Sequence, residues 1–209
     1  IYDVLSKYKI LTCLHKFYTD NEIISEFNLR KNKNEIMDPN LFIISTGIGK
    51  DELTQNQEIE RLKNIFSNIN CNWICIDIAN GYISNLIYFC KLVRSNFPNK
   101  IIIAGNVVTK ELVEDLLNNG VDIVKIGIGP GAACTTRLKA GVGMPQLSAI
   151  IECAETARKM GGHIVADGGI TTPGDLGKAY GAGADFIMCG SIFAGHDENP
   201  GEIIEENNN

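Results

Sequence analysis

Short runs of apolar, largely β-branched residues alternate along this chain with stretches of helical periodicity. The runs are apolar throughout instead of alternating with polar residues, as expected of strands that are covered on both faces. This alternation predicts a parallel sheet whose strands are joined by crossover helices. The expected strands span residues 10–15, 41–45, 73–79, 101–105, 123–127, 163–167 and 186–190.

Six helices are expected between these strands, and two of them carry recognisable boundary signals. Thr109 can cap the N-terminus of one helix, and Pro173 suits the first turn of another. Two polar stretches, residues 30–40 and the Asn-rich tail 205–209, are expected to be solvated and loosely ordered. The expected helices span residues 21–27, 51–68, 84–96, 110–118, 145–160 and 173–180.

Two closures of such a sheet remain possible, an open doubly wound sheet and a (β/α)8 barrel, also called a TIM barrel. A barrel usually takes about 250 residues, whereas this chain has 209 residues. Only seven strands are expected instead of eight, so a barrel here would lack its first strand. We expect one domain over residues 1–209.

Composition argues against several functional classes. The formal net charge of −6 is opposite to the basic patch of a nucleic-acid-binding protein. No apolar run approaches the roughly 20 residues that span a membrane. The seven cysteines form no CxxC pair and no zinc-ligand spacing, which fits a reducing compartment, and we therefore expect the cytoplasm.

Small and polar residues follow almost every expected strand, at the end where barrel enzymes form their active sites. Asp77 ends one strand, and Asp167, a candidate ligand for a ribose diol or a helix cap, ends another. The pairs Gly168-Gly169 and Gly190-Ser191 follow the last two strands. Glycine amides can approach an anion closely, so these pairs predict a phosphate site, with ordinary tight turns as the alternative.

The glycine-rich loop at residues 127–137 is the most informative stretch. Its alternating glycines can turn carbonyl oxygens inward to hold a monovalent cation, or can simply make the loop mobile. Cys134 lies on this loop, outside the apolar runs that contain most other cysteines, in which a thiol behaves as a small hydrophobe. It can act as a nucleophile if a neighbouring charge lowers its pKa, and Arg137 is the nearest candidate.

Residues 125–137 and 141–146 resemble the cysteine loop shared by IMP dehydrogenases and GMP reductases. The similarity continues through residues 166–170 and 190–195 and covers the chain from about Ile10 to Glu202. An IMP dehydrogenase more typically has a His near Asn80, and many carry an inserted regulatory domain for which residues 16–41 are too few. Stretches that look more like GMP reductase are residues 14–18, 75–82, 105–109, 145–154 and 173–175.

This resemblance implies a (β/α)8 barrel, usually a homotetramer, that converts GMP to IMP and ammonia with NADPH. Cys134 would attack C2 of the purine and form a covalent thioimidate, and Thr136 would relay a proton to the leaving ammonia. The implied ligands of the GMP ribose and phosphate are Asp167, Gly168, Gly169, Gly190 and Ser191. The residues implied along the cofactor are Asp77, Ile78, Ala79, Ile128 and Gly129. The carbonyls implied to bind a potassium ion belong to Gly129, Gly131, Cys134 and Arg137.

The sequence also departs from the family pattern. Ala132 stands where the family usually has a Ser that contacts the nucleotide phosphate, and losing one such hydrogen bond costs about 1–3 kcal/mol of affinity. An N-terminal segment with a cofactor lysine, and a C-terminal region with a flap over the base and a glutamate partner for the catalytic Thr, are expected but do not appear. Despite these departures, GMP reductase is the leading prediction, because several stretches look more like that enzyme than like an IMP dehydrogenase. The alternatives are an IMP dehydrogenase, which uses NAD and water, and a non-catalytic nucleotide-binding homologue.

Overall fold

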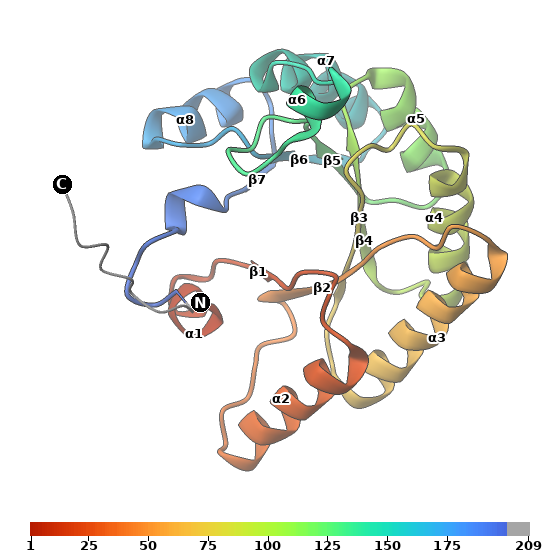
Figure 1. The fold of residues 1–209 in the computed structure, drawn as a ribbon, viewed down its shortest axis with the longest axis vertical. Helices are drawn as coiled ribbons and strands as arrows, with labels where there is room; N and C mark the ends of the chain where they lie inside the picture. Colours follow the sequence, from red (N-terminus) through yellow and green to blue (C-terminus); the bar gives the residue numbers. More distant parts are fainter. Residues whose placement is uncertain (200–209) are drawn as a thin grey trace.

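A computed structural model describes residues 1–199 of the chain. Seven parallel strands pair in the order of the sequence, from β1 to β7. A doubly wound sheet would reverse its strand order at a switch point, and this sheet has no such reversal, so the barrel-type fold is confirmed. The sheet curls into an open arc with the helices on its outer side (Figure 1). The strands are β1 (Thr12–Cys13), β2 (Phe42–Thr46), β3 (Trp73–Asp77), β4 (Ile101–Val107), β5 (Ile123–Ile126), β6 (His163–Asp167) and β7 (Phe186–Met188).

Every expected helix is present, and each follows its strand along the chain. The six are α2 (Asp20–Asn32), α3 (Glu52–Asn68), α4 (Ser84–Asn96), α5 (Lys110–Asn118), α7 (Gln146–Lys159) and α8 (Pro173–Gly181). The described residues also contain short helical segments: α1 (Tyr2–Leu5), η1 (Ser6–Tyr8), α6 (Thr136–Ala140) and η2 (Ser191–Phe193). No helix among residues 1–199 is long and apolar enough to cross a membrane.

Several expected boundaries were wrong. Helix α2 begins at a capping box of Thr19 and Glu22 and runs to Asn32, so the start of the expected linker is helical. Arg30 explains the extension, because its guanidinium pairs with Glu26 one turn earlier and with Asp3.

At the strand ends the differences are smaller. Strand β1 has two residues instead of six, and β4 continues to Val107. Strands β3, β5 and β7 end one or two residues early, where the chain turns away from the sheet. Thr109 occupies the N-cap of α5, but its hydroxyl accepts a hydrogen bond from Tyr82 instead of capping the helix. The expected tail, residues 205–209, lies outside the described residues.

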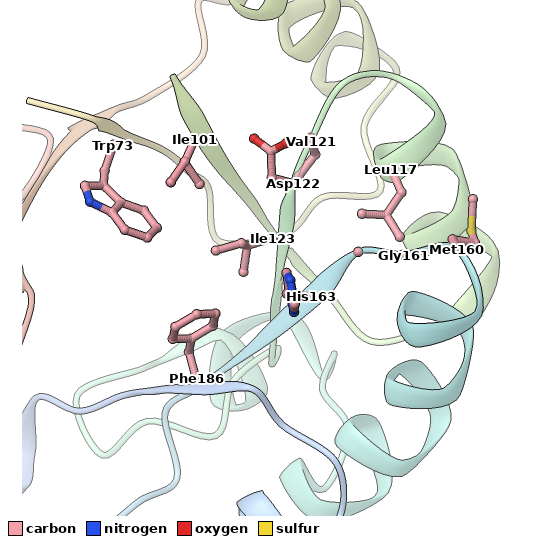
Figure 2. A pocket seen from close by; sticks show the side chains of 11 residues that line it. Trp73, Ile101, Leu117, Val121, Asp122, Ile123, Met160, Gly161, His163 and Phe186 are labelled. Carbon is pink, nitrogen blue, oxygen red and sulfur yellow. The ribbon is translucent and has the colours of Figure 1, made fainter. Parts of the chain in front are cut away.

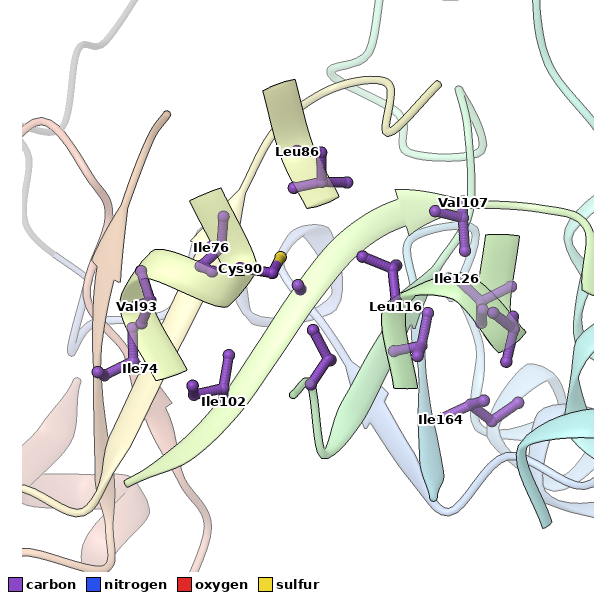
Figure 3. Close-up of a cluster of buried hydrophobic side chains, with 14 of the residues drawn as sticks. Ile74, Ile76, Leu86, Cys90, Val93, Ile102, Val107, Leu116, Ile126 and Ile164 are labelled. Carbon is purple, nitrogen blue, oxygen red and sulfur yellow. The ribbon is translucent and has the colours of Figure 1, made fainter. Parts of the chain in front are cut away.

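Side chains along the strands alternate between the two faces of the sheet, and both faces are apolar. The outward-facing residues pack against the helices in one large cluster (Figure 3), which includes Ile74, Ile76, Ile102, Ile126 and Ile164. The inward-facing residues form a second, smaller cluster of Ile43, Cys75, Ile103, Ile123 and Val165. Burial on both faces explains why the strands lack polar alternation, and it makes a charged residue inside a strand conspicuous.

Candidate functional site

A buried lysine joins two carboxylates at the carboxyl end of the sheet. Lys125 lies on β5 with its side chain 3% exposed, and its Nζ lies 2.7 Å from Asp77 Oδ1 and 2.7 Å from Asp167 Oδ2. Burial opposes the charge of Lys125, but Asp167 and Asp77 outweigh it and raise the pKa of this ammonium. Burial likewise opposes the charge of Asp77, but Lys125 and Lys16 lower the pKa of this carboxyl overall. Lys125 and Asp77 are therefore both ionised at neutral pH.

Two further side chains complete this network. Lys16 follows β1, and its Nζ donates to the Asp77 carbonyl at 2.8 Å and lies 3.4 Å from the Asp77 carboxylate. Asn106 on β4 donates from Nδ2 to the Gly127 carbonyl at 2.6 Å and to Asp167 Oδ2 at 2.9 Å. The Oδ1 atom of Asn106 is buried and has no hydrogen-bond partner among the residues that the structure describes. Four strands thus contribute polar groups to one end of the sheet.

Cys134 is exposed on the loop between β5 and α7. Its Sγ lies 3.3 Å from the hydroxyl of Thr136, the first residue of α6. Hydrogen bonds from the side chain and backbone of Thr136 lower the pKa of the Cys134 thiol, and the charge of Arg137 adds a smaller effect. Arg137 therefore acts in the expected direction, but Thr136 is the larger cause.

Most other thiols behave differently. Burial raises the pKa of Cys90 and of Cys153 to about 12 each, so these thiols stay protonated. Cys13 is a second exception, which the sequence did not indicate. Hydrogen bonds from Cys75 and Ser45 lower the pKa of the Cys13 thiol, although burial opposes them.

The cysteine loop packs against the turn that follows β6. A Cβ atom built on Gly168 would lie 3.1 Å from the Gly131 amide nitrogen, and one on Gly169 would lie 3.2 Å from Pro130 Cβ. Side chains at these two glycines would push the loop away. The Asp167 carboxylate is close enough to the Cys134 thiol to oppose its ionisation. The loop that carries the thiol and the turn after Asp167 therefore share one site.

The two pairs expected to bind phosphate, Gly168-Gly169 and Gly190-Ser191, lie near neighbouring strand ends. The Gly168 amide donates to the Met188 carbonyl at the end of β7, at 3.4 Å. Gly168 and Gly169 both have positive φ angles, of 85° and 76°, a conformation that glycine adopts without strain. One residue, Cys189, separates Gly190 from the end of β7; Gly190 is the N-cap of η2, and Ser191 is its first residue. The structure therefore places Asp167, Gly168 and Gly169 at the end of β6, and Gly190 and Ser191 shortly after the end of the neighbouring strand β7.

The residues expected along the cofactor are only partly accessible. Asp77, the last residue of β3, and Ile78 are half-buried, whereas Ala79 is exposed. Ile128 is 1% exposed, so its side chain packs inside and only its backbone can face a ligand. Gly129 has a φ of 76°, and a Cβ there would lie 2.6 Å from Arg137 Cγ, so the arginine stem covers this turn.

Backbone carbonyls in the cysteine loop are the oxygen donors available for a cation. The Gly131 carbonyl accepts from the Cys134 amide at 3.0 Å, and the Arg137 carbonyl accepts from the Gly141 amide at 3.2 Å. Each carbonyl oxygen keeps a second lone pair, and backbone carbonyls suit K⁺. Within residues 1–199, no group of three or more His, Cys, Asp or Glu side chains could hold a metal ion.

A cavity of about 450 Å³ opens at the opposite end of the sheet (Figure 2). Its lining includes the first residue of five successive strands: Trp73, Ile101, Ile123, His163 and Phe186. Active sites of β/α barrels form at the carboxyl ends of the strands. This cavity is therefore separate from the site that contains Cys134 and Lys125.

The parallel strands of this sheet follow the order of the sequence, and a thiol and glycine-rich turns lie at their carboxyl ends. These features define a β/α-barrel protein whose candidate site is formed by the loops at that end. A family model described as "IMP dehydrogenase / GMP reductase domain" matches residues 5–209, and the chain belongs to this family.

Individual relatives agree with this assignment. The chain is 51% identical over 205 residues to the GMP reductase of Buchnera aphidicola subsp. Schizaphis graminum and 48% identical over 206 residues to that of Yersinia pestis. Each alignment covers 98% of this chain and 56% of the relative, so the chain spans about half the length of these proteins. A crystal structure of inosine 5′-monophosphate dehydrogenase from Legionella pneumophila matches with a TM-score of 0.82 and 32% identity, over 98% of this chain and 58% of that one.

Sequence reasoning assigned no role to Lys125, Asn106 or Lys16. A signal for Lys125 was present, because it is the one charged residue in the apolar strand β5. For Asn106 and Lys16 the sequence shows only polar residues after a strand, which is equally true of many loop residues. Their contacts with Asp167 and Asp77 depend on the curvature of the sheet.

Proposed function

We propose that the protein containing this chain is a GMP reductase, which converts GMP to IMP and ammonia with NADPH. One observation carries the proposal: an exposed thiol of lowered pKa, Cys134, lies beside the Thr136 hydroxyl on a loop packed against the turn after Asp167. The chain that carries this arrangement has 51% and 48% sequence identity to two proteins named GMP reductase.

Cys134 performs covalent catalysis in this proposal. Its thiolate forms a bond with C2 of the guanine, and the C2 amino group leaves as ammonia after receiving a proton relayed by Thr136. The resulting thioimidate divides one difficult substitution into two easier steps. NADPH, when bound, supplies a hydride to C2. The C–S bond then breaks, so that IMP leaves and the Cys134 thiolate is restored.

The other end of the nucleotide is held by polar groups after β6 and β7. In this proposal Asp167 accepts hydrogen bonds from the ribose hydroxyls. The phosphate is bound by the amides of Gly168, Gly169, Gly190 and Ser191, an arrangement common at this end of β/α barrels. Ala132 offers no hydroxyl to the phosphate, so these amides carry that interaction without it.

The cofactor lies along the end of β3 in the proposed complex. The Asp77 carboxylate is ionised and half-buried beside Lys16, which suits an acceptor for ribose hydroxyls near a negatively charged dinucleotide. Ile78, Ala79 and the backbone of Ile128 and Gly129 complete this surface. A potassium ion would be held by the carbonyls of Gly129, Gly131, Cys134 and Arg137. We further propose that the enzyme is a cytoplasmic homotetramer.

The test is Cys134→Ser in the intact protein, assayed by loss of NADPH absorbance and formation of IMP. Removing a covalent nucleophile is expected to reduce turnover on the order of 10³-fold or more, without loss of GMP binding. Cys153→Ala, which changes a buried thiol on α7, is the matched control and is expected to retain turnover. Undiminished IMP formation by Cys134→Ser would refute the proposal.

An IMP dehydrogenase is the second candidate, because the matching crystal structure is of such an enzyme. That reaction would use the same thiol, with IMP and NAD as substrates and water as the second reactant. Supplying GMP with NADPH, and separately IMP with NAD, distinguishes the two. Consumption of NADPH with GMP supports the reductase, and formation of NADH with IMP supports the dehydrogenase.

A further inference from the structure

Among residues 1–199, Lys125 is the one buried, charged side chain that the reaction proposed above does not use. It lies on the inner face of the sheet with the apolar residues of the smaller core cluster. Burying an ammonium with its carboxylate partners rarely stabilises a fold more than apolar side chains of the same size would. A gain in stability therefore does not explain this residue, whereas its contacts with Asp77 and Asp167 connect it to the neighbouring site.

The register of the sheet explains how one ammonium reaches two distant carboxylates. Asp77 pairs with Gly105, and Gly105 pairs with Lys125, so the three residues form one row across β3, β4 and β5. A Cβ atom on Gly105 would lie 2.3 Å from the Lys125 carbonyl oxygen, so no side chain fits between them. The lysine can therefore extend across β4. On the other side Lys125 pairs with Val165, and Asp167 lies two residues further along the same face of β6.

The contacts of Asp167 are concentrated on one oxygen. Its Oδ2 accepts from Lys125 at 2.7 Å and from Asn106 at 2.9 Å. Its Oδ1 accepts no hydrogen bond from any residue between 1 and 199. The carboxylate is thus fixed through one oxygen, and the other is left available for a ligand. Asp77 is held in a similar way, through Oδ1 by Lys125, with Lys16 near Oδ2.

We propose that Lys125 is a positioning residue that orients Asp167 for the nucleotide and Asp77 for the dinucleotide cofactor, so that both sites depend on one ammonium. This inference rests on the proposed function, which assigns one ligand to each carboxylate. A perturbation of Lys125 should therefore weaken the binding of both ligands. A change at either carboxylate should alter the affinity for the ligand that it does not touch.

The first experiment compares Lys125→Met, Lys125→Arg and the surface control Lys159→Met in the intact protein. Dissociation constants for GMP alone and for NADPH alone are measured by calorimetry, and kcat and KM by turnover. Lys125→Met is expected to raise both dissociation constants by about 10-fold or more, and Lys159→Met to leave them unchanged. Lys125→Arg keeps a cation that can bridge two carboxylates, so it should recover most of both affinities.

A second experiment does not depend on the folding of Lys125→Met. Asp77→Asn is expected to change the dissociation constant for GMP by about threefold or more, and Asp167→Asn that for NADPH. If each variant affects only its own ligand, or if Lys125→Met binds both ligands as the wild type does, the inference is wrong even when turnover is normal. If the wild type forms no IMP from GMP, the proposed function fails, and the same variants are measured with IMP and NAD.

Discussion

The substitution Gly127→Ala tests the close packing of the start of the cysteine loop against Asp167 and Gln146. This residue follows β5 with a φ of 137°. A Cβ atom there would lie 2.4 Å from the Asp167 carbonyl oxygen and 2.8 Å from Oε1 of Gln146. The Gly127 carbonyl also accepts the hydrogen bond from Asn106. The methyl group would therefore displace Asp167 or the start of α7.

The expected destabilisation has two parts. Holding a non-glycine residue at this backbone conformation costs about 1–3 kcal/mol, and forcing a methyl group into packed surroundings costs typically about 1–3 kcal/mol more. The two together come to roughly 2–6 kcal/mol, which is a large fraction of the about 5–15 kcal/mol that stabilises a typical domain.

Two other glycines separate these contributions. Gly161 has a φ of 74° but nothing within 4 Å of a built Cβ, so Gly161→Ala should show only the backbone cost, about 1–2 kcal/mol. Gly177 lies inside α8 with open space around it, and Gly177→Ala should stabilise the protein by about 0.5–1 kcal/mol.

Urea unfolding of the intact protein, followed by circular dichroism, gives the three free energies of unfolding. The same Gly127→Ala protein should also bind GMP more weakly, because Asp167 moves. If Gly127→Ala destabilises the protein no more than Gly161→Ala does, the close contact with Asp167 is incorrect.

Three further predictions concern the site and the core. Thr136→Val removes the hydroxyl that lowers the pKa of Cys134, so alkylation of this thiol by iodoacetamide at neutral pH should slow several-fold; an unchanged rate would contradict the assigned cause. The pKa of Asp77 is lowered in the folded state, so its stabilising contribution is lost as the pH falls through that lowered value. Lys16→Met raises this pKa, and acid unfolding should therefore begin at a higher pH than in the wild type. Phe89→Ala opens a cavity in the fully buried cluster between α4 and the sheet and should cost about 3–5 kcal/mol in urea unfolding.

The fold was predictable because its main signal is repeated. Seven apolar runs separated by helical stretches allow few arrangements, and the observed strand order selects the barrel type. The errors are local. The short helix α6 was not expected, since five residues after a glycine-rich loop carry no visible periodicity. The extension of α2 depends on the contact of Arg30 with Asp3, which is distant in sequence.

The site was predictable in part, and for a different reason. Cys134, Asp167 and the glycine turns follow strands directly, so the rule that strand ends meet at one edge was enough to group them. That rule gives no information about which oxygen of a carboxylate is free or which thiol has a lowered pKa. The proximity of Cys13 to Ser45 and Cys75, and its lowered pKa, required the three-dimensional arrangement of β1, β2 and β3.

Lys125 shows most clearly where sequence reasoning ends. A single lysine in an apolar strand indicates an unusual environment, but the partners follow only from register. A shift of one residue between β4 and β5 would turn Lys125 to the other face of the sheet, toward the helices and away from Asp77. Gly105 is also required, because the absence of its side chain allows Lys125 to cross β4. The network therefore depends jointly on two carboxylates, one ammonium and one missing Cβ, and a motif search that scores charged residues alone would not detect it.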